Sequence, residues 1–250
     1  MHETSNRRFA LPRLQLLGMS SHKSNDVALT RLGHKPLILL TRLILELRPI
    51  SRETLMAFLW PEASETRARG SLRQALHVLR ETVGEECLAT DRRAVGLRSA
   101  PLCDLADFLG AVRANEWCRA ALLYGGTLLE GVTVTDATDA ELWLDFERRR
   151  VRKLFETAAA ATLEDFQSGT TSADRLEVAR RLRDQNPRQI RSWKFLYDEL
   201  IRSGTESELR MEQAALSAQL ETGQIVDVDG AMQVLDSSRH TRALTLLQGK

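Results

Sequence analysis

The spacing of apolar residues in the first hundred positions changes from an alternating to a helical pattern. Leu11–Gly18 and Val27–Leu32 alternate apolar and polar side chains, which predicts two short strands. Apolar residues then recur at positions 37, 38, 40, 43, 44 and 47, and Pro36 suits the first position of a helix. The pattern therefore predicts strands followed by a helix that starts near residue 36.

Two more helices and a hairpin are predicted next. Ser51 is a good N-cap for a short helix that Trp60-Pro61 ends. Ser64 and Gly84 bracket a longer helix with an apolar stripe made of Leu72, Leu76, Leu79 and Val83. The run CLATDRRAVGLR then predicts two short strands joined by a turn at 91–93. Strands, three helices and a hairpin follow one another in the order of a winged helix-turn-helix.

The chain from residue 101 onward is predicted to be almost entirely helical. Around 187–214 the spacing approaches that of a tetratricopeptide repeat, with Pro187, Trp193, Leu196, Tyr197, Leu200, Gly204 and Ala214. We therefore expect a mainly α fold with four parts: a flexible arm (1–10), a winged-helix domain with a small β-sheet and wing (11–100), a tetratricopeptide-like all-α domain (101–222), and a C-terminal tail or closing helix (223–250).

Charge divides the chain in the same place. The whole chain has 35 Lys+Arg and 34 Asp+Glu, a net charge of +1. Residues 1–100 contain 16 basic and 10 acidic residues, net +6, whereas residues 101–250 contain 19 and 24, net −5. A basic first part can meet a polyanion, and an acidic remainder favours protein partners.

Composition and motifs exclude several other classes. The chain is 43% hydrophobic and 28% charged, which is typical of a soluble globular protein. Its longest apolar stretch, Pro36–Leu40, is far too short for a membrane span, and three cysteines fit a reducing cytoplasm. A P-loop, a C-x-x-C pair and histidines at metal-ligand spacing are all missing from the sequence, and Asp227–Gly230 matches a calcium loop only at its start. We expect no enzyme activity, no metal, no cofactor and no membrane partner.

The third helix has the strongest chemical signal. At 100° per residue its face opposite the apolar stripe contains Arg67, Ser71, Gln74 and His77, and Arg69, Arg73 and Arg80 flank the stripe. Gln pairs bidentately with adenine and Arg with guanine in the major groove, which admits one helix. The alternative readings are an ordinary surface helix, a solvated turn at Arg92-Arg93, and a Trp60 that serves core packing while its indole N–H faces a phosphate.

Four motifs occur in the chain in the order and spacing of a known family. They are LWPE (59–62), SLRQALHVLR (71–80), LLEG (128–131) and WLDFERRRVR (143–152). Because of them, the chain resembles the SARP-type bacterial activators over roughly residues 11–222. That family joins an OmpR-type winged helix to a bacterial transcriptional activator domain. Two features depart from its pattern: GTESELRMEQAALSAQLETG (204–223) lacks the expected aromatic and leucine positions, and the final 28 residues do not match.

The resemblance implies a transcription activator that binds direct repeats in double-stranded promoter DNA and contacts RNA polymerase holoenzyme. We also expect a second copy of the chain as a partner, in a homodimer, and a cytoplasmic, nucleoid-associated location. The resemblance also implies a recognition helix that reads DNA through Arg67, Ser71, Arg73, Gln74, His77 and Arg80. It matches Trp60, Arg92 and Arg93 to backbone and wing positions. Ser51, Arg52 and Arg69 are further predicted contacts to the DNA backbone. Two alternatives are a helical-repeat scaffold for protein partners and a regulator whose helical domain senses a ligand.

Overall fold

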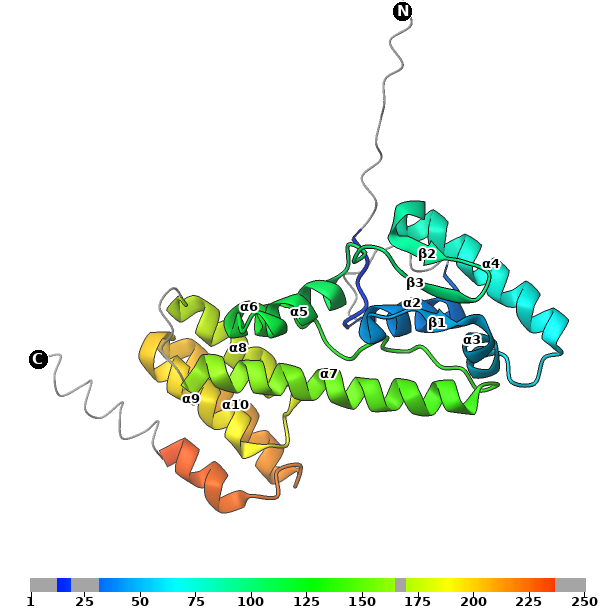
Figure 1. Cartoon of the computed structure of the whole chain (residues 1–250). Helices are drawn as coiled ribbons and strands as arrows, with labels where there is room; N and C mark the ends of the chain where they lie inside the picture. The colour runs from blue at the N-terminus through cyan, green and yellow to red at the C-terminus, as the bar shows by residue number, and fades with distance from the viewer. Residues whose placement is uncertain (1–12, 19–31, 165–169, 237–250) are drawn as a thin grey trace, which may run out of the picture. The chain divides into compact units, whose positions relative to one another are not determined.

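The computed structural model describes residues 13–18, 32–164 and 170–236 (Figure 1). The predicted fold class is confirmed: the chain is mainly α, with a small antiparallel sheet near the N-terminus followed by an all-helical region. Two compact units form, one from Met1–Gly110 with Leu123–Lys153 (unit 1) and the other from Ala111–Leu122 with Leu154–Lys250 (unit 2). The unit that contains the small sheet thus includes residues 123–153, while the predicted boundaries at 100 and 222 stay predictions.

Unit 1 contains the helices and the hairpin that the sequence predicts. In chain order its first elements are α2 (His34–Glu46), β1 (Ile50–Ser51), α3 (Arg52–Leu59), α4 (Glu65–Val83), the 3-10 turn η1 (Glu85–Cys87), β2 (Leu88–Thr90) and β3 (Ala94–Leu97). Pro36 is the third residue of α2 and not the first, because the helix begins at His34. Ser51 caps α3 as predicted, since its hydroxyl accepts a hydrogen bond from the Thr54 amide at 3.0 Å.

The sheet has the strand order β1-β3-β2, and both pairs are antiparallel. β2 and β3 are the predicted hairpin, and Leu88 pairs with Leu97 at its base. The sequence does not predict β1, because two residues carry no recognisable alternation. β1 joins the sheet through the pairs Ile50–Val95 and Ser51–Ala94, which places the start of α3 directly beside the hairpin.

The predicted first strand at 11–18 is wrong for the part that the structure describes. Residues 13–18 form only two isolated bridges, Leu14 with Cys103 and Leu17 with Leu128. The Asp104 carboxylate accepts the amides of Leu16 at 2.7 Å and Leu17 at 3.0 Å, so a side chain satisfies donors that a strand would otherwise pair. The second predicted strand, Val27–Leu32, lies outside the described residues except for Leu32.

Gly18 makes a close crossing of two segments of unit 1 possible. Its φ is +73°, and a Cβ there would lie 2.3 Å from the carbonyl oxygen of Gly125. The Gly18 amide donates to the carbonyl of Thr127 at 3.0 Å. Only glycine fits a backbone approach this close, so Gly18 and Gly125 fasten residues 13–18 to the segment after residue 122.

Residues 123–153 also pack directly on α2 and α3 within unit 1. Trp143, near the start of α7 (Thr138–Glu164), packs edge-on against Phe58 of α3, with ring centroids 5.7 Å apart. His34 Nδ1 lies 2.7 Å from the carbonyl oxygen of Thr133, and Lys35 forms an ion pair with Asp136 at 2.7 Å. These contacts make the 123–153 segment part of the same core.

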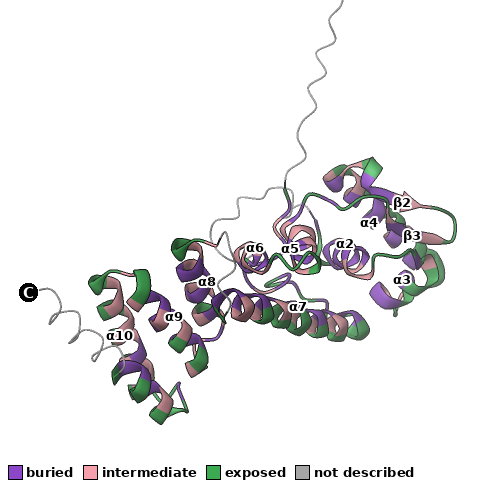
Figure 2. Ribbon diagram, turned by 60° about the vertical axis from the view of Figure 1, so that its left-hand side comes forward, coloured by how far each residue is buried: buried purple, intermediate pink, exposed green. Residues whose placement is uncertain are grey.

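Unit 2 is helical in its described residues. It contains most of α6 (Trp117–Leu123), the end of α7, α8 (Ser172–Gln185), α9 (Ile190–Ser203), α10 (Glu206–Glu221) and a further helix over residues 228–236; α5 (Asp104–Arg113) begins in unit 1 and ends in unit 2. Its core, drawn purple in Figure 2, centres on Trp193 and Tyr197 of α9, with Leu216 of α10 and Val234 beyond it. The helix at 228–236 agrees with the closing-helix alternative for that part of the tail.

Arg175 of α8 is a buried cation that connects three helices of unit 2. Its side chain is only 5% exposed and donates to the carbonyl oxygens of Thr162 at 2.6 Å and Leu163 at 2.8 Å. The Glu199 carboxylate of α9 accepts a further hydrogen bond from Arg175 at 2.6 Å. Arg175 therefore satisfies carbonyls that the end of α7 leaves free and fixes α9 at the same time.

We expect Arg175→Met to lower the free energy of unfolding by about 3 kcal/mol or more, because it leaves the buried Glu199 carboxylate and two carbonyls without this donor. Urea unfolding followed by circular dichroism measures the loss. The matched control is Arg188→Met, at an exposed arginine in the turn between α8 and α9, which should change stability by less than about 0.5 kcal/mol. Equal effects of the two substitutions would contradict this role of Arg175.

Candidate nucleic-acid interface

α4 places its apolar and polar side chains on opposite faces, as the sequence predicts. Leu72, Leu76, Leu79 and Val83 are all buried, together with Ala68 and Ala75. The outward face contains the exposed side chains of Arg67, Arg73, Gln74 and His77, with Ser71 half-buried at its edge. His77 lies 3.5 Å from Glu81, and this exposed pair leaves the ring accessible. The helix thus offers hydrogen-bond donors and acceptors to a ligand on one continuous face.

The hairpin turn beside α4 is held by Asp91. Its carboxylate accepts the backbone amides of Arg93 at 2.6 Å and Ala94 at 2.7 Å. These two hydrogen bonds, that of Ala94 first, hold the pKa of Asp91 below its ordinary value, so the carboxylate stays ionised and the turn stays closed at neutral pH. Arg92 and Arg93 are exposed at the tip, where they can reach a ligand next to α4.

Two arginines assigned by the sequence to DNA contact hold the hairpin in place. Arg52 of α3 donates from Nε to the carbonyl oxygen of Asp91 at 2.8 Å. Arg80 of α4 donates from Nη2 to the Thr90 hydroxyl at 2.6 Å. The hairpin is therefore attached to α3 on one side and to α4 on the other. The sequence does not reveal these roles, because each partner lies on another element, 39 residues away for Arg52 and 10 for Arg80, and only the fold brings them together.

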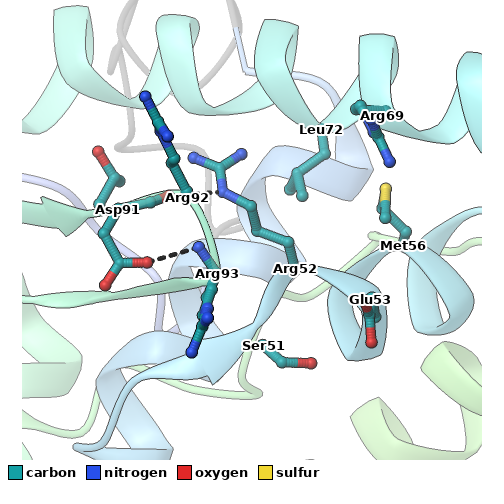
Figure 3. A pocket seen from close by; sticks show the side chains of 10 residues that line it. Ser51, Arg52, Glu53, Met56, Arg69, Leu72, Asp91, Arg92 and Arg93 are labelled. Atoms are coloured by element: carbon teal, nitrogen blue, oxygen red, sulfur yellow. Dashed lines mark hydrogen bonds between the residues drawn. The ribbon is translucent and has the colours of Figure 1, made fainter.

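A groove of about 870 Å³ lies between α3, α4 and the hairpin (Figure 3). Its walls include four arginines and two carboxylates, a net positive charge, over an apolar floor of Met56 and Leu72. The arginines are Arg52, Arg69, Arg92 and Arg93. Figure 3 shows Arg52 and Arg92 extending towards α4 and Arg93 extending away from it. A groove of this charge attracts an extended anion such as a phosphodiester backbone.

The remaining predicted backbone contacts are less free. Arg69 forms an ion pair with Glu65 at 2.5 Å, one turn earlier on α4. The Ser51 hydroxyl caps α3, although the residue is exposed and lines the groove. Trp60 is half-buried, with the Lys35 ammonium 5.5 Å from its ring centroid, and it does not line the groove. The structure thus brings Ser51, Arg52, Arg69, Arg92 and Arg93 together and leaves Trp60 outside the groove.

The described residues also bear on two other kinds of site. Histidines, cysteines and carboxylates do not gather there in any group of three or more that could hold a metal ion. Among those residues, no helix is both long and apolar enough to cross a membrane. Asp227, the first residue of the calcium-like DVDG run, accepts the Gly230 amide at 2.9 Å, as in an ordinary turn before a helix.

Comparison with known proteins finds a distant structural similarity. No protein-family model matches the chain, and no curated protein matches it. Among solved structures, the chain is similar to EmbR of Mycobacterium tuberculosis, determined in complex with a low-affinity phosphopeptide, at 18% sequence identity and a TM-score of 0.39. The match covers 85% of this chain and 65% of the EmbR chain. A likeness at this level bears on neither the function nor the partners of the chain.

The Arg80–Thr90 contact predicts how the hairpin responds to substitution. Thr90→Val keeps the shape of the side chain and removes the hydroxyl, so Arg80 loses its acceptor on the hairpin. A half-buried hydrogen bond contributes about 1 kcal/mol, so amides of residues 88–97 should exchange with solvent about fivefold faster. Hydrogen exchange followed by mass spectrometry measures this. Thr90→Ser retains the hydroxyl and should exchange like the wild type; similar exchange in Thr90→Val would refute the attachment.

Proposed function

We propose that this chain is a sequence-specific DNA-binding transcriptional regulator in which α4 enters the major groove. The observation that carries the proposal is the outward face of α4, where Arg67, Arg73, Gln74 and His77 stand exposed beside the arginine-lined groove. The major groove admits one α-helix, and these side chain types pair with base edges. An ordinary surface helix needs no arginine-lined groove beside it, so the groove supports DNA binding by α4 over a purely structural role.

The two parts of the interface have different tasks in this proposal. Side chains on α4 read base edges and provide specificity, whereas the groove and the hairpin tip bind backbone phosphates and provide affinity. Arg92 and Arg93 reach the backbone or the minor groove next to the helix. Arg52 and Arg80 act mainly by holding the hairpin in register with α4, so that both parts engage one duplex at the same time.

The finer parts of the proposal rest on the motif resemblance to SARP-type activators. They are activation of transcription at promoter direct repeats, contact with RNA polymerase holoenzyme through the helical unit, and a cytoplasmic, nucleoid-associated location. The net charge of −5 over residues 101–250 supports a protein partner over a second DNA contact for that part. We propose no enzymatic reaction and no cofactor for either unit.

Gln74→Ala should weaken binding to the preferred duplex by about 1–3 kcal/mol and relax the preference at one base pair, because a bidentate contact to one adenine is lost. The duplex is first selected from a random library with the full-length chain, and affinity is then measured by fluorescence anisotropy on every single-base variant of it. The melting temperature should equal that of the wild type, since Gln74 is exposed. An unchanged base preference would refute the reading role of Gln74.

Arg92→Ala should weaken binding to the selected duplex and to random DNA by the same factor. A lost phosphate contact also lowers the slope of log K against log salt concentration by about 0.9. Titrations at several salt concentrations measure both effects, with Arg188→Ala as a control outside the interface. If the full-length wild type shows no salt-dependent binding to any duplex, the DNA proposal fails, and the helical-repeat scaffold and the ligand-sensing regulator become the leading alternatives.

A further inference from the structure

α7 has an exposed apolar pair on the part of the helix that belongs to unit 1. Leu142 is 64% exposed and Phe146 is 55% exposed, one helical turn apart. The opposite side of the same stretch is buried through Ala140, Leu144 and Val151, so the packing of α7 inside unit 1 does not need the outer pair. Exposed apolar side chains that adjoin one another form a contiguous patch, and contiguous apolar patches are the surfaces at which proteins bind partners.

The residues around this pair follow a heptad pattern. Asp139, Leu142, Phe146 and Arg149 are spaced three, four and three residues apart, which is the a-d-a-d spacing of a coiled-coil seam. Asp139 and Arg149 are exposed, and in the described part of the chain neither side chain has an ion-pair or hydrogen-bond partner. The seam therefore has an apolar centre, a free negative charge at its first position and a free positive charge at its last.

The order of these four residues is self-complementary. When two such helices lie antiparallel with residue 144 at the centre, Leu142 faces Phe146 of the partner subunit, and Asp139 faces Arg149 of the partner subunit. Each a position then meets a d position, as antiparallel seams require. A parallel pair would instead place like charges opposite one another. The four seam residues thus specify an antiparallel orientation and one register for two α7 helices. A partner of another sequence would not carry the same complementary order.

We propose that a second copy of this chain docks on this seam, so that two α7 helices pack antiparallel about a two-fold axis that crosses the seam at the level of residue 144. An isologous contact of this kind uses the same patch on both copies. With two apolar side chains from each copy, it is smaller than the about 800 Å² per partner of a standard interface, so the dimer is reversible.

The proposed dimer does not depend on the proposed function. Two copies that sit side by side on direct repeats are related by translation, whereas the α7 contact relates copies by rotation. The seam is therefore a separate contact from that between neighbours on one operator. It is tested without DNA, so a failure here leaves the DNA proposal standing, and a failure of DNA binding leaves the dimer standing.

Charge reversal tests the register. The full-length wild type should self-associate reversibly in sedimentation velocity runs up to about 0.5 mM. Asp139→Arg alone places two arginines opposite each other at both ends of the seam, and Arg149→Asp alone does the same with two aspartates. Each single reversal should raise the dimer Kd about tenfold, since two attractions become two repulsions. The double variant restores both opposite pairs and should return to within about twofold of the wild type.

Phe146→Glu should abolish association, because it places a charge in the apolar centre of the seam. The matched control is Arg188→Asp, which makes the same charge change at an exposed turn outside the seam and should dimerise like the wild type. The proposal is overturned by a wild type that stays monomeric over the whole range. It is also overturned by association that ignores the single reversals, or by a double variant that is not restored.

Discussion

The burial of one stripe of α4 determines which way the polar side chains of that helix point in the candidate interface. Leu72, Leu76 and Leu79 are almost completely inaccessible, so α4 cannot rotate about its own axis without exposing them. Exposing one such leucine costs about 1.5–3 kcal/mol. The hydrophobic contact that stabilises unit 1 thereby fixes the outward face of the helix, and a DNA-reading role needs no additional device to orient it.

Charged side chains also have a structural role in this chain, because they hold the connections between helices in place. Arg148 of α7 donates to the carbonyl oxygens of Leu128 at 3.1 Å, Leu129 at 2.8 Å and Val132 at 2.8 Å. These carbonyls lie in or next to LLEG, and Arg148 lies in WLDFERRRVR, so two motifs that carry the family resemblance are linked by one guanidinium. Arg175 has a comparable role in unit 2. Such residues suggest function in a sequence, although their first task is to satisfy backbone carbonyls that have no secondary structure to pair with.

Local patterns made the helices of unit 1 predictable, and contacts between segments far apart in the chain explain the errors. The caps at Ser51 and Gly84 and the stripe of α4 act within one helix, so they can be recognised without knowing the fold. The strand expected at 11–18 alternates correctly, yet the amides of Leu16 and Leu17 bond to Asp104, which lies almost ninety residues away. β1 was missed because its two residues become a strand only when β3 is present. Sequence patterns report the local energy of a segment and not the partner that tertiary structure provides.

The same distinction applies to the candidate site. The sequence predicts DNA contacts for seven arginines without distinguishing among them. Residue type and helical angle do not show whether a guanidinium already has a hydrogen-bond partner in the folded chain. The structure separates them: the guanidinium groups of Arg52, Arg69 and Arg80 have hydrogen-bond partners within unit 1. Among the described residues, those of Arg67, Arg73, Arg92 and Arg93 form no ion pair or hydrogen bond.

In the proposed DNA complex a phosphate must compete with an existing hydrogen bond at the first three sites, so the net charge of +6 over residues 1–100 overstates the charge available to a polyanion. The four free arginines include two on the outer face of α4 and two at the hairpin tip. Affinity should thus depend most on the tip, where the charges are solvated and need no rearrangement. Specificity should depend on α4, whose orientation the core enforces.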